Sequence, residues 1–326
     1  MNGAGRLSIY AAGLVVAFAG AFAVAAAVVP DQVVTDWEGE ALPAHATGGH
    51  ESADEAPATA DDAVGEVTLP GLSLSAYGYV LSPVSAPTAV GDAGKLSFQI
   101  ADEQGAQLTA YETSHEKDLH LIVVRTDGRE YRHVHPTLDD HTGRWSIPWQ
   151  WAKAGSYRVY ADFKPAVEGA PDKVTLTRTI DVAGEIDPAA TTETRTTVEV
   201  DGYEVTVAGT LTAGSTSELT LSVFRDEKPV TALEPYLGAF GHLVALRDGD
   251  LAYLHVHAEG DKPKVDDRAG PDITFFAEAP TAGRYLLFLD FKVDGEVHTA
   301  EFALDATNHG GEAPAEGHSE SDPDGH

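Results

Sequence analysis

The sequence predicts an all-β protein with two tandem antiparallel β-sandwich domains behind an N-terminal transmembrane helix. A pattern of three histidines that occurs twice predicts the tandem domains. Short segments of alternating apolar residues, separated by turn residues about every ten positions, predict the sandwiches. An uncharged apolar stretch near the N-terminus predicts the helix.

The N-terminal segment, residues 1–30, is predicted to be a membrane anchor or a signal segment. Residues 8–29 carry no charge, and about 20 apolar residues suffice for a helix to cross a bilayer. Arg6 precedes this stretch and acidic residues follow it, so the positive-inside rule puts the N-terminus in the cytoplasm and the bulk of the chain outside. The lipid bilayer is therefore a predicted partner, through residues 8–29. Small residues at 25–27 leave secretion after signal cleavage as the alternative.

Two segments are predicted to be disordered, because no apolar period runs through them. Residues 31–65 form an acidic linker, and residues 306–326 form a tail rich in histidine and acidic residues. Between them lie two predicted sandwich domains, the first repeat at 66–184 and the second repeat at 194–305.

Each repeat contains short predicted strands and no predicted helix. In the first repeat the strands are 66–81, 95–100, 119–125, 130–135, 144–148, 156–163 and 173–182. In the second repeat they are 196–211, 218–224, 242–247, 251–258, 273–277, 284–292 and 297–304.

A shared tyrosine predicts that the sandwiches are immunoglobulin-like. Adding 128 to each number maps Tyr157 and Asp162 on Tyr285 and Asp290, and each tyrosine directly follows a glycine-containing turn. This resembles the tyrosine corner of immunoglobulin-like sandwiches, in which the hydroxyl holds the turn. We therefore interpret both tyrosines as structural and both aspartates as turn or strand-end residues, with a position near the histidine site as the alternative for the aspartates.

Composition restricts the partners and the metal chemistry. The formal net charge is −31, which repels nucleic acid and anionic surfaces and attracts cations. There is no cysteine, and the only methionine is Met1, so thiolate and thioether ligands are excluded. A metal would be held by imidazole and oxygen, which favours Zn²⁺ or Cu²⁺.

The duplicated histidines are the candidate metal ligands. One copy reads HLIVVRTDGREYRHVH and the other HLVALRDGDLAYLHVH, and an offset of 122 relates them. The predicted ligands are His120, His133 and His135 in the first repeat, and His242, His255 and His257 in the second.

A hairpin would bring each set together. A two-residue turn at Asp127-Gly128 pairs residues whose numbers add to 255, so that His120 faces His135 and Ile122 faces His133. Because side chains alternate between the faces of a strand, all three imidazoles then share one face. Gly249-Asp250 gives the second copy the same expected arrangement. Three imidazoles supply three zinc ligands and leave one position open.

Both His120 and His115 have an alternative interpretation, and so does the predicted lack of catalysis. The run from Leu121 to Val124 is apolar on both faces, so His120 could simply be a packed core histidine. His115 has no counterpart in the second repeat and is interpreted as a loop residue, with membership of the first site as the alternative. Catalysis is not expected and no catalytic residue is assigned, because no nucleophile elbow, P-loop or HExxH motif occurs. A metal-dependent hydratase, hydrolase or cupin-like enzyme is the remaining enzymatic alternative.

The segments HEKDLHLIVVRTDGREYRHVHP and YLGAFGHLVALRDGDLAYLHVHA resemble a group of uncharacterised bacterial envelope-anchored proteins with HLIVVR…HVHP-type repeats. That group is similar in style to secreted heavy-metal-associated sandwich proteins. The resemblance implies an extracytoplasmic role and metal handling. The predicted function is thus buffering, sensing or delivery of Zn²⁺ or Cu²⁺ through one three-histidine cluster in each repeat. The alternative is a structural or interaction module of the cell envelope.

Overall fold

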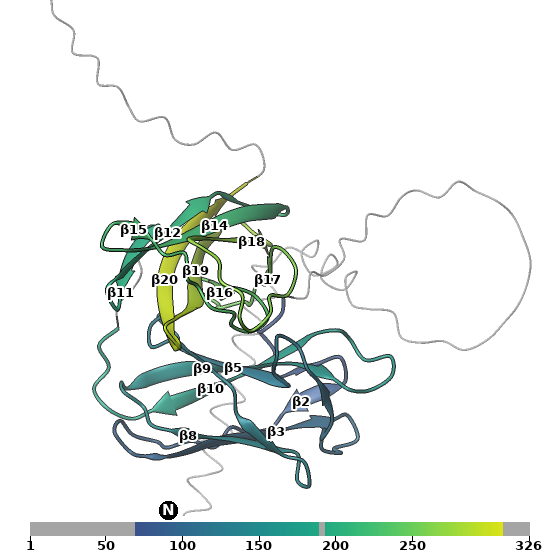
Figure 1. Cartoon of the computed structure of the whole chain (residues 1–326). Helices are drawn as coiled ribbons and strands as arrows, with labels where there is room; N and C mark the ends of the chain where they lie inside the picture. The colour runs from purple at the N-terminus through teal and green to yellow at the C-terminus, as the bar shows by residue number, and fades with distance from the viewer. Residues whose placement is uncertain (1–68, 189–192, 309–326) are drawn as a thin grey trace, which may run out of the picture. The chain divides into compact units, whose positions relative to one another are not determined.

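The computed structural model describes residues 69–188 and 193–308, and every regular element in these ranges is a β-strand (Figure 1). The prediction of an all-β protein is confirmed. The described residues of both repeats belong to one compact unit. The predicted membrane segment at 8–29, the linker at 31–65 and the predicted tail from residue 309 on lie outside the described residues. The predicted tail began at residue 306, but residues 306 and 307 belong to the last strand, Glu296–Thr307. No helix in the described ranges is long and apolar enough to cross a membrane.

Two sheets make up the first repeat. One has the strand order β1-β2-β3-β8-β7, and the other has the order β10-β9-β5-β6, with β4 paired to β9. The strands are β1 (Ser75–Ala76), β2 (Tyr79–Leu81), β3 (Gly94–Asp102), β4 (Tyr111–Glu112), β5 (Leu119–Arg125), β6 (Arg132–Val134), β7 (Thr137–Asp139), β8 (Arg144–Trp149), β9 (Gly155–Pro165) and β10 (Val174–Val182).

The second repeat has a corresponding pair of sheets. They have the orders β11-β12-β14-β18-β17, with β15 paired to β14, and β13-β20-β19-β16. The strands are β11 (Thr197–Val200), β12 (Tyr203–Gly209), β13 (Leu211–Thr212), β14 (Thr216–Arg225), β15 (Lys228–Pro229), β16 (Gly241–Arg247), β17 (His255–Ala258), β18 (Asp272–Glu278), β19 (Gly283–Val293) and β20 (Glu296–Thr307).

The longest predicted strands are interrupted by turns. The predicted strand 196–211 is divided at Asp201-Gly202, where both residues have a positive φ and the chain reverses between β11 and β12. Of the predicted strand 66–81, the described residues from 69 on form β1 and β2, which join through Tyr77 and Gly78, again with positive φ. Apolar alternation continued through these turns, so it did not indicate where each strand ends.

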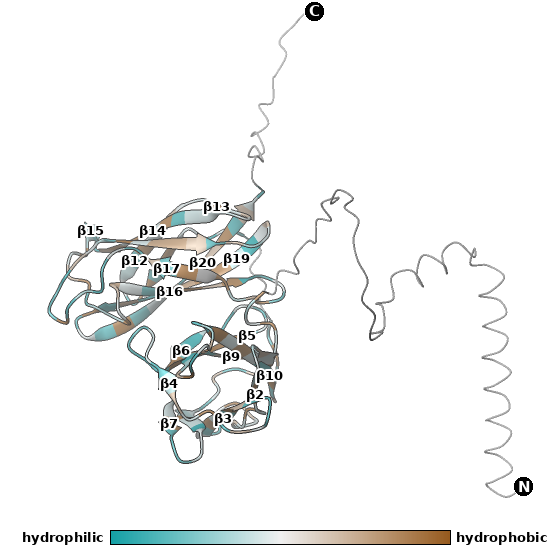
Figure 2. Ribbon diagram, turned by 90° about the vertical axis from the view of Figure 1, so that its right-hand side faces the viewer, coloured by the Kyte–Doolittle hydropathy of each residue, from teal (hydrophilic) through white to brown (hydrophobic). Residues whose placement is uncertain are grey.

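Each repeat has its own core, and a third apolar cluster joins the repeats. Leu121 and Val123 of β5 point into the core of the first sandwich, whereas Ile122 and Val124 point into the third cluster. We call this third cluster the repeat interface. Its members are Ile122, Val124, Tyr131, Tyr160, Val244, Leu246, Leu251, Tyr253, Leu286, Phe288 and Ala303. Figure 2 shows the hydrophobic residues along β5 and β9. The run from 121 to 124 is apolar on both faces because both faces are buried.

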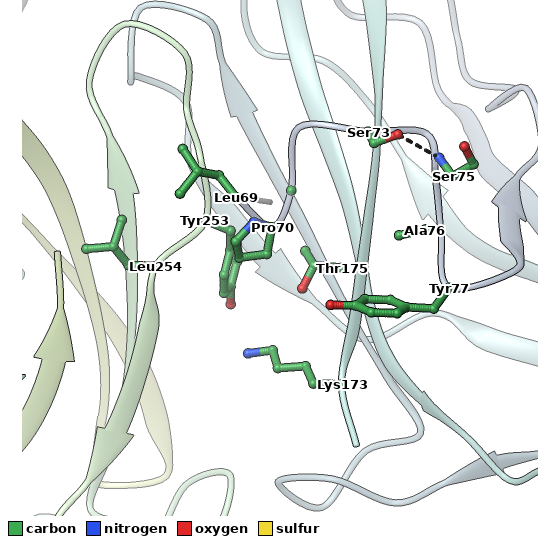
Figure 3. A pocket seen from close by; sticks show the side chains of 11 residues that line it. Leu69, Pro70, Ser73, Ser75, Ala76, Tyr77, Lys173, Thr175, Tyr253 and Leu254 are labelled. Atoms are coloured by element: carbon green, nitrogen blue, oxygen red, sulfur yellow. Dashed lines mark hydrogen bonds between the residues drawn. The ribbon is translucent and has the colours of Figure 1, made fainter. Parts of the chain in front are cut away.

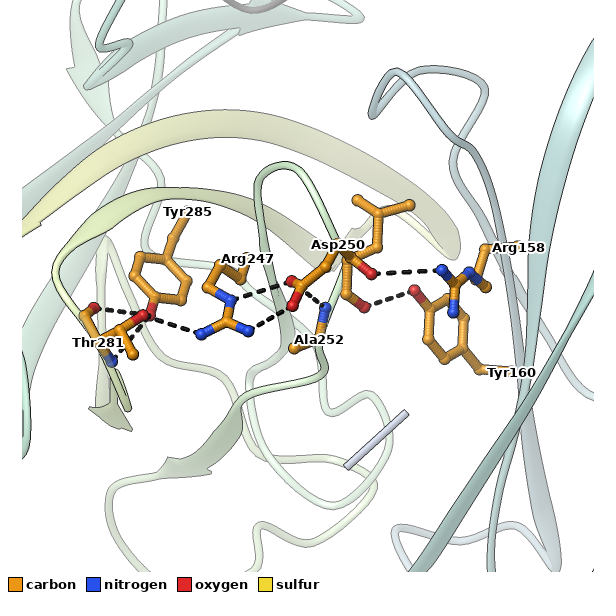
Figure 4. Close-up of polar contacts among 8 residues, drawn as sticks. Arg158, Tyr160, Arg247, Asp250, Ala252, Thr281 and Tyr285 are labelled. Atoms are coloured by element: carbon orange, nitrogen blue, oxygen red, sulfur yellow. Dashed lines mark hydrogen bonds and ion pairs between the residues drawn. The ribbon is translucent and has the colours of Figure 1, made fainter. Parts of the chain in front are cut away.

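The repeat interface is held by aromatic pairs and by hydrogen bonds between the repeats. Tyr131 stacks on Phe288 with ring centroids 3.9 Å apart, and Tyr253 lies 5.9 Å from Tyr160. The Tyr160 hydroxyl donates to the Leu251 carbonyl at 2.7 Å (Figure 4). Tyr131 is equivalent to Tyr253, and Tyr160 is equivalent to Phe288. The two pairs are therefore related in the way that contacts are related across the interface of a two-fold dimer.

Both tyrosine corners are confirmed. The Tyr157 hydroxyl donates to the Lys153 carbonyl at 2.8 Å, and the Tyr285 hydroxyl donates to the Thr281 carbonyl at 2.8 Å. Figure 4 shows the second of these contacts beside the ion pair of Arg247 with Asp250. Each tyrosine thus fixes the turn before its strand.

The first histidine hairpin has the predicted register, although its turn differs. Ile122 pairs with His133, as the rule that the numbers add to 255 requires. The tight turn is Arg125–Gly128, closed by a bond from the Gly128 amide to the Arg125 carbonyl at 2.8 Å. Gly128 has a φ of 78°, and a Cβ there would lie 2.3 Å from Cδ1 of Leu286 in the second repeat. Only glycine suits both the turn and the close contact.

The second hairpin departs from the expected arrangement. Leu246 bridges Tyr253 in the expected register, but β17 then pairs with β18 in the opposite sheet. His242 on β16 and His257 on β17 therefore belong to different sheets. The first copy changes sheet later, between β6 and β7, where Pro136 lacks the amide needed to continue pairing. Ala258 occupies the equivalent position and pairs with Phe275.

Candidate metal centre

Three imidazoles converge on the interface-facing side of the first hairpin. His120 is on β5, His133 is on β6 and His135 follows β6 directly. Nδ1 of His120 lies 2.9 Å from Nε2 of His133 and 3.2 Å from Nε2 of His135. Two ligands of a tetrahedral zinc ion with bonds of about 2.0–2.1 Å are separated by about 3.3 Å. The two distances from Nδ1 of His120 are close to this separation, and the ligand atoms of the triad all lie within 4.8 Å of one another.

The outer nitrogens of two rings have acceptors as partners. Nε2 of His120 donates to the Ser114 carbonyl at 3.0 Å. Nδ1 of His133 donates to Oδ2 of Asp290 at 2.7 Å, and both of these side chains are almost fully buried. A carbonyl and an ionised carboxylate accept only, so each ring carries its proton on the outer nitrogen. If both rings are neutral, the inner nitrogens of His120 and His133 then each carry a lone pair.

These two lone pairs face each other at 2.9 Å, which is favourable only if a cation lies between them. The cation is either an additional proton or a metal ion. Burial, with a second contribution from repulsion by His133, lowers the pKa of His120 to about 4 and that of His135 to about 3. Protonation of these rings is thus unfavourable at neutral pH, and a neutral imidazole is the form that binds metal.

Two more histidines lie against the three. The ring of His242, from the second repeat, stacks on His120 with centroids 5.4 Å apart and lies 4.8 Å from the ring of His133. The ring of His115 lies 5.5 Å from that of His242. Burial is the largest cause of a lowered pKa in both His115 and His242. His115 lies in the turn between β4 and β5, as the loop interpretation expected, and its ring also packs beside the cluster.

The other predicted ligands are placed differently. Within the described residues, the one group of three or more histidine or acidic side chains with converging ligand atoms is His120, His133 and His135. His242 packs against this group by stacking on His120, and His257 on β17 is exposed. The backbone at His255 pairs with Glu278 on β18. The structure thus assembles the first triad and separates the strands that carry the second.

Asp290 takes the less favoured of its two sequence interpretations. It is not a turn or strand-end residue but lies on β19 opposite His242, next to the site, and accepts a hydrogen bond from Nδ1 of His133. Its other oxygen accepts a bond from the Thr299 hydroxyl at 2.6 Å. A carboxylate behind a histidine ligand fixes the ring and raises its basicity. The available signal was the duplication of this aspartate at a fixed distance from the tyrosine corner.

The space beside the histidines is small. Two cavities of about 30 and 40 Å³ border the cluster, one lined by His115 and His242 and the other by Ser114 and His120. Such volumes hold an ion or a water molecule and exclude an organic ligand. A cavity of about 510 Å³ lies further along the interface, lined in part by Tyr77, Lys173 and Tyr253 (Figure 3). None of the triad lines this larger cavity.

The comparisons with solved structures show only distant likeness. Invasin, a bacterial integrin-binding protein, is 15% identical with a TM-score of 0.22, over 71% of this chain and 39% of its own. Domains 5–6 of the S-layer protein SbsC are 10% identical with a TM-score of 0.21, over 71% of this chain and 99% of theirs. The fibronectin(III)-like modules of Clostridium thermocellum CbhA are 9% identical with a TM-score of 0.18, over 73% of this chain and 100% of theirs. Likeness at this level carries no argument about function.

A family comparison is more specific. No curated protein matches the sequence. One domain family matches it twice, at residues 75–182 and at residues 197–308, which together are more than half of the chain. These segments coincide with the two sandwiches. The chain therefore belongs to the family described as Domain of unknown function (DUF8832) and contains two copies of its domain.

Proposed function

We propose that this protein binds one divalent transition-metal ion, Zn²⁺ or Cu²⁺, through His120, His133 and His135. The ion would be buffered, sensed or delivered outside the cytoplasm by a chain anchored through residues 8–29. The observation that carries the proposal is the contact of Nδ1 of His120 with Nε2 of His133 at 2.9 Å, while the other nitrogen of each ring faces a hydrogen-bond acceptor.

Three further features support a metal ion in this position. The ligand atoms of the triad lie within 4.8 Å of one another. Asp290 supplies a buried negative charge next to His133, which offsets part of the charge of a divalent ion. The adjacent cavities leave room for water as a fourth ligand but not for an organic substrate, which favours binding over catalysis.

The alternative is a structural or interaction module of the cell envelope whose histidines only pack. The observation that favours it is the apolar repeat interface, which joins two sandwiches without requiring a metal. In that case one of the three facing nitrogens would hold a proton. The two functions differ in whether a metal binds at stoichiometric amounts.

The test is a titration of the purified protein, prepared without a histidine tag, with Zn²⁺ and with Cu²⁺. The control is a variant with His120, His133 and His135 all changed to Ala, which keeps every other histidine. We expect one tight equivalent in the native protein that the variant lacks. Equal binding by both proteins would reject the metal site and leave the packing role.

The metal-loaded protein also tests the enzymatic alternative. Hydration of CO₂ and hydrolysis of a small ester are the two reactions that a three-histidine zinc site supports most simply. We expect no rate above that of the triple variant. A metal-dependent rate that the triple variant lacks would make the site an enzyme's active centre.

A further inference from the structure

The candidate ligands come from the first repeat, but the group that orients one of them comes from the second. The Nδ1 proton of His133 is bound by Asp290 of β19 at 2.7 Å. His242 of β16 covers the cluster from the same side. At the edge of the site, Lys262 of the second repeat is 3.2 Å from Glu116 in the loop before β5. The geometry of the triad thus depends on contact between the repeats.

We infer that metal binding at His120, His133 and His135 is coupled to docking of the second repeat on the first, with Asp290 as the positioning residue that carries the coupling. This inference rests on the proposed function. If the repeats separate, His133 loses its carboxylate, its ring is free to rotate, and its inner nitrogen becomes less basic. Coupling between two equilibria is reciprocal, so a bound metal ion must hold the repeats together more tightly.

One backbone bond reports directly on the docking of the repeats. The amide of Tyr253 in the second repeat donates to the carbonyl of Pro70, which precedes β1, at 2.9 Å. Hydrogen exchange at this amide requires the two segments to part. If only the docked form binds metal, Zn²⁺ at 100 times its Kd slows exchange through the undocked form by up to about 100-fold.

The direct test changes Asp290→Asn in the full chain. We expect the affinity for Zn²⁺ to fall about 10- to 100-fold, as is typical when the partner of a histidine ligand is removed. We also expect saturating Zn²⁺ to slow exchange at the Tyr253 amide less than about 3-fold, against more than about 10-fold in the native protein. The matched control is Asp201→Asn, which removes a similar carboxylate from His298 (Nδ1 to Oδ2, 2.8 Å) away from the site. It should bind Zn²⁺ and slow exchange as the native protein does.

A second pair of variants probes docking without touching a ligand or its partner. Tyr160→Phe removes the hydroxyl that binds the Leu251 carbonyl across the interface, whereas Tyr131→Phe removes a buried hydroxyl for which the described residues offer no partner. In the metal-free protein, Tyr160→Phe should speed exchange at the Tyr253 amide about 3- to 10-fold, and Zn²⁺ should reverse most of this. Tyr131→Phe should not speed it.

The outcomes separate the inference from the proposed function. If the native protein binds neither Zn²⁺ nor Cu²⁺, the proposed function fails and the inference fails with it. If the native protein binds Zn²⁺ tightly but exchange at the Tyr253 amide does not slow, the site is real and the coupling is wrong. Native affinity in the Asp290→Asn variant would remove Asp290 from its positioning role.

Discussion

The two repeats place the same aspartate in different surroundings. Asp162 and Asp290 each accept a bond from a threonine on the neighbouring strand, Thr175 and Thr299 respectively. The second oxygen of Asp290 accepts a hydrogen bond from Nδ1 of His133, whereas that of Asp162 lies 3.3 Å from the ammonium group of Lys173. The position equivalent to Lys173 in the second repeat is Val297.

This difference explains why two similar sequences build one site. Asp290 has no lysine at the position of Lys173 and orients His133 of the other repeat. Asp162 is instead paired with the ammonium group of Lys173, and β17 pairs with β18 in the other sheet. A duplicated motif therefore indicates duplicated strands, but a duplicated site also requires the same neighbours.

The largest expected effect concerns the aromatic pairs, the part of the interface that is symmetric. Phe288→Ala and Tyr160→Ala should each lower the free energy of unfolding by about 3–5 kcal/mol, because each leaves a cavity in the repeat interface. Tyr77→Ala, at a side chain that is 69% exposed, should change it by less than about 0.5 kcal/mol. Urea unfolding measures all three. If only one of the two interface variants lowered the free energy of unfolding by less than about 1 kcal/mol, the two aromatic pairs would not contribute equally to stability.

The next effect separates the two histidine copies. His135→Ala should weaken Zn²⁺ binding by more than about 100-fold, because a lost ligand costs more than a lost outer partner. His257→Ala, at the equivalent position on β17, should leave binding within about 3-fold, since β17 pairs away from β16. Competition with a coloured chelator measures both affinities. Equal losses would show that the second copy also contributes a ligand.

These predictions draw on what the sequence could and could not indicate. Periodicity gave the β class, and the pairing rule gave the register of Ile122 with His133, because both depend on residues close in sequence. The contact of His133 with Asp290 joins positions 157 residues apart and follows from the packing of two sandwiches. A local signal for that packing existed in the run from Leu121 to Val124, whose two apolar faces both had to be covered.

The metal-free protein should also lose stability as the pH falls below neutral. The pKa of His120 is about 4 and that of His135 about 3 in the folded state, against about 6.5 for an unfolded chain. Below pH 6.5 the unfolded chain binds protons that these rings in the folded state do not. The free energy of unfolding therefore falls with decreasing pH, by at most about 1.4 kcal/mol per pH unit for each histidine.

Urea unfolding at pH 7, 6 and 5 measures this slope. His135→Gln removes one of the two groups and should make the slope less steep. His141→Gln, at an exposed side chain, should leave it unchanged. A native slope that neither variant alters would mean that other groups govern the response to acid.

The smallest expected effect tests the lysine that distinguishes the two sides. Lys173→Val copies the second repeat at this position and removes a positive charge that helps to lower the pKa of both His115 and His242. Zn²⁺ affinity should rise about two- to five-fold at low ionic strength, and the gain should shrink at about 1 M salt, where charges are screened within about 3 Å. The variant should still bind one ion, because β17 keeps its pairing with β18.

A second tight equivalent would mean that the lysine alone, and not the change of sheet, keeps the second site from forming. A fall in affinity would mean instead that Lys173, which lies 4.9 Å from the ring of Tyr253, helps to hold the second repeat against the first.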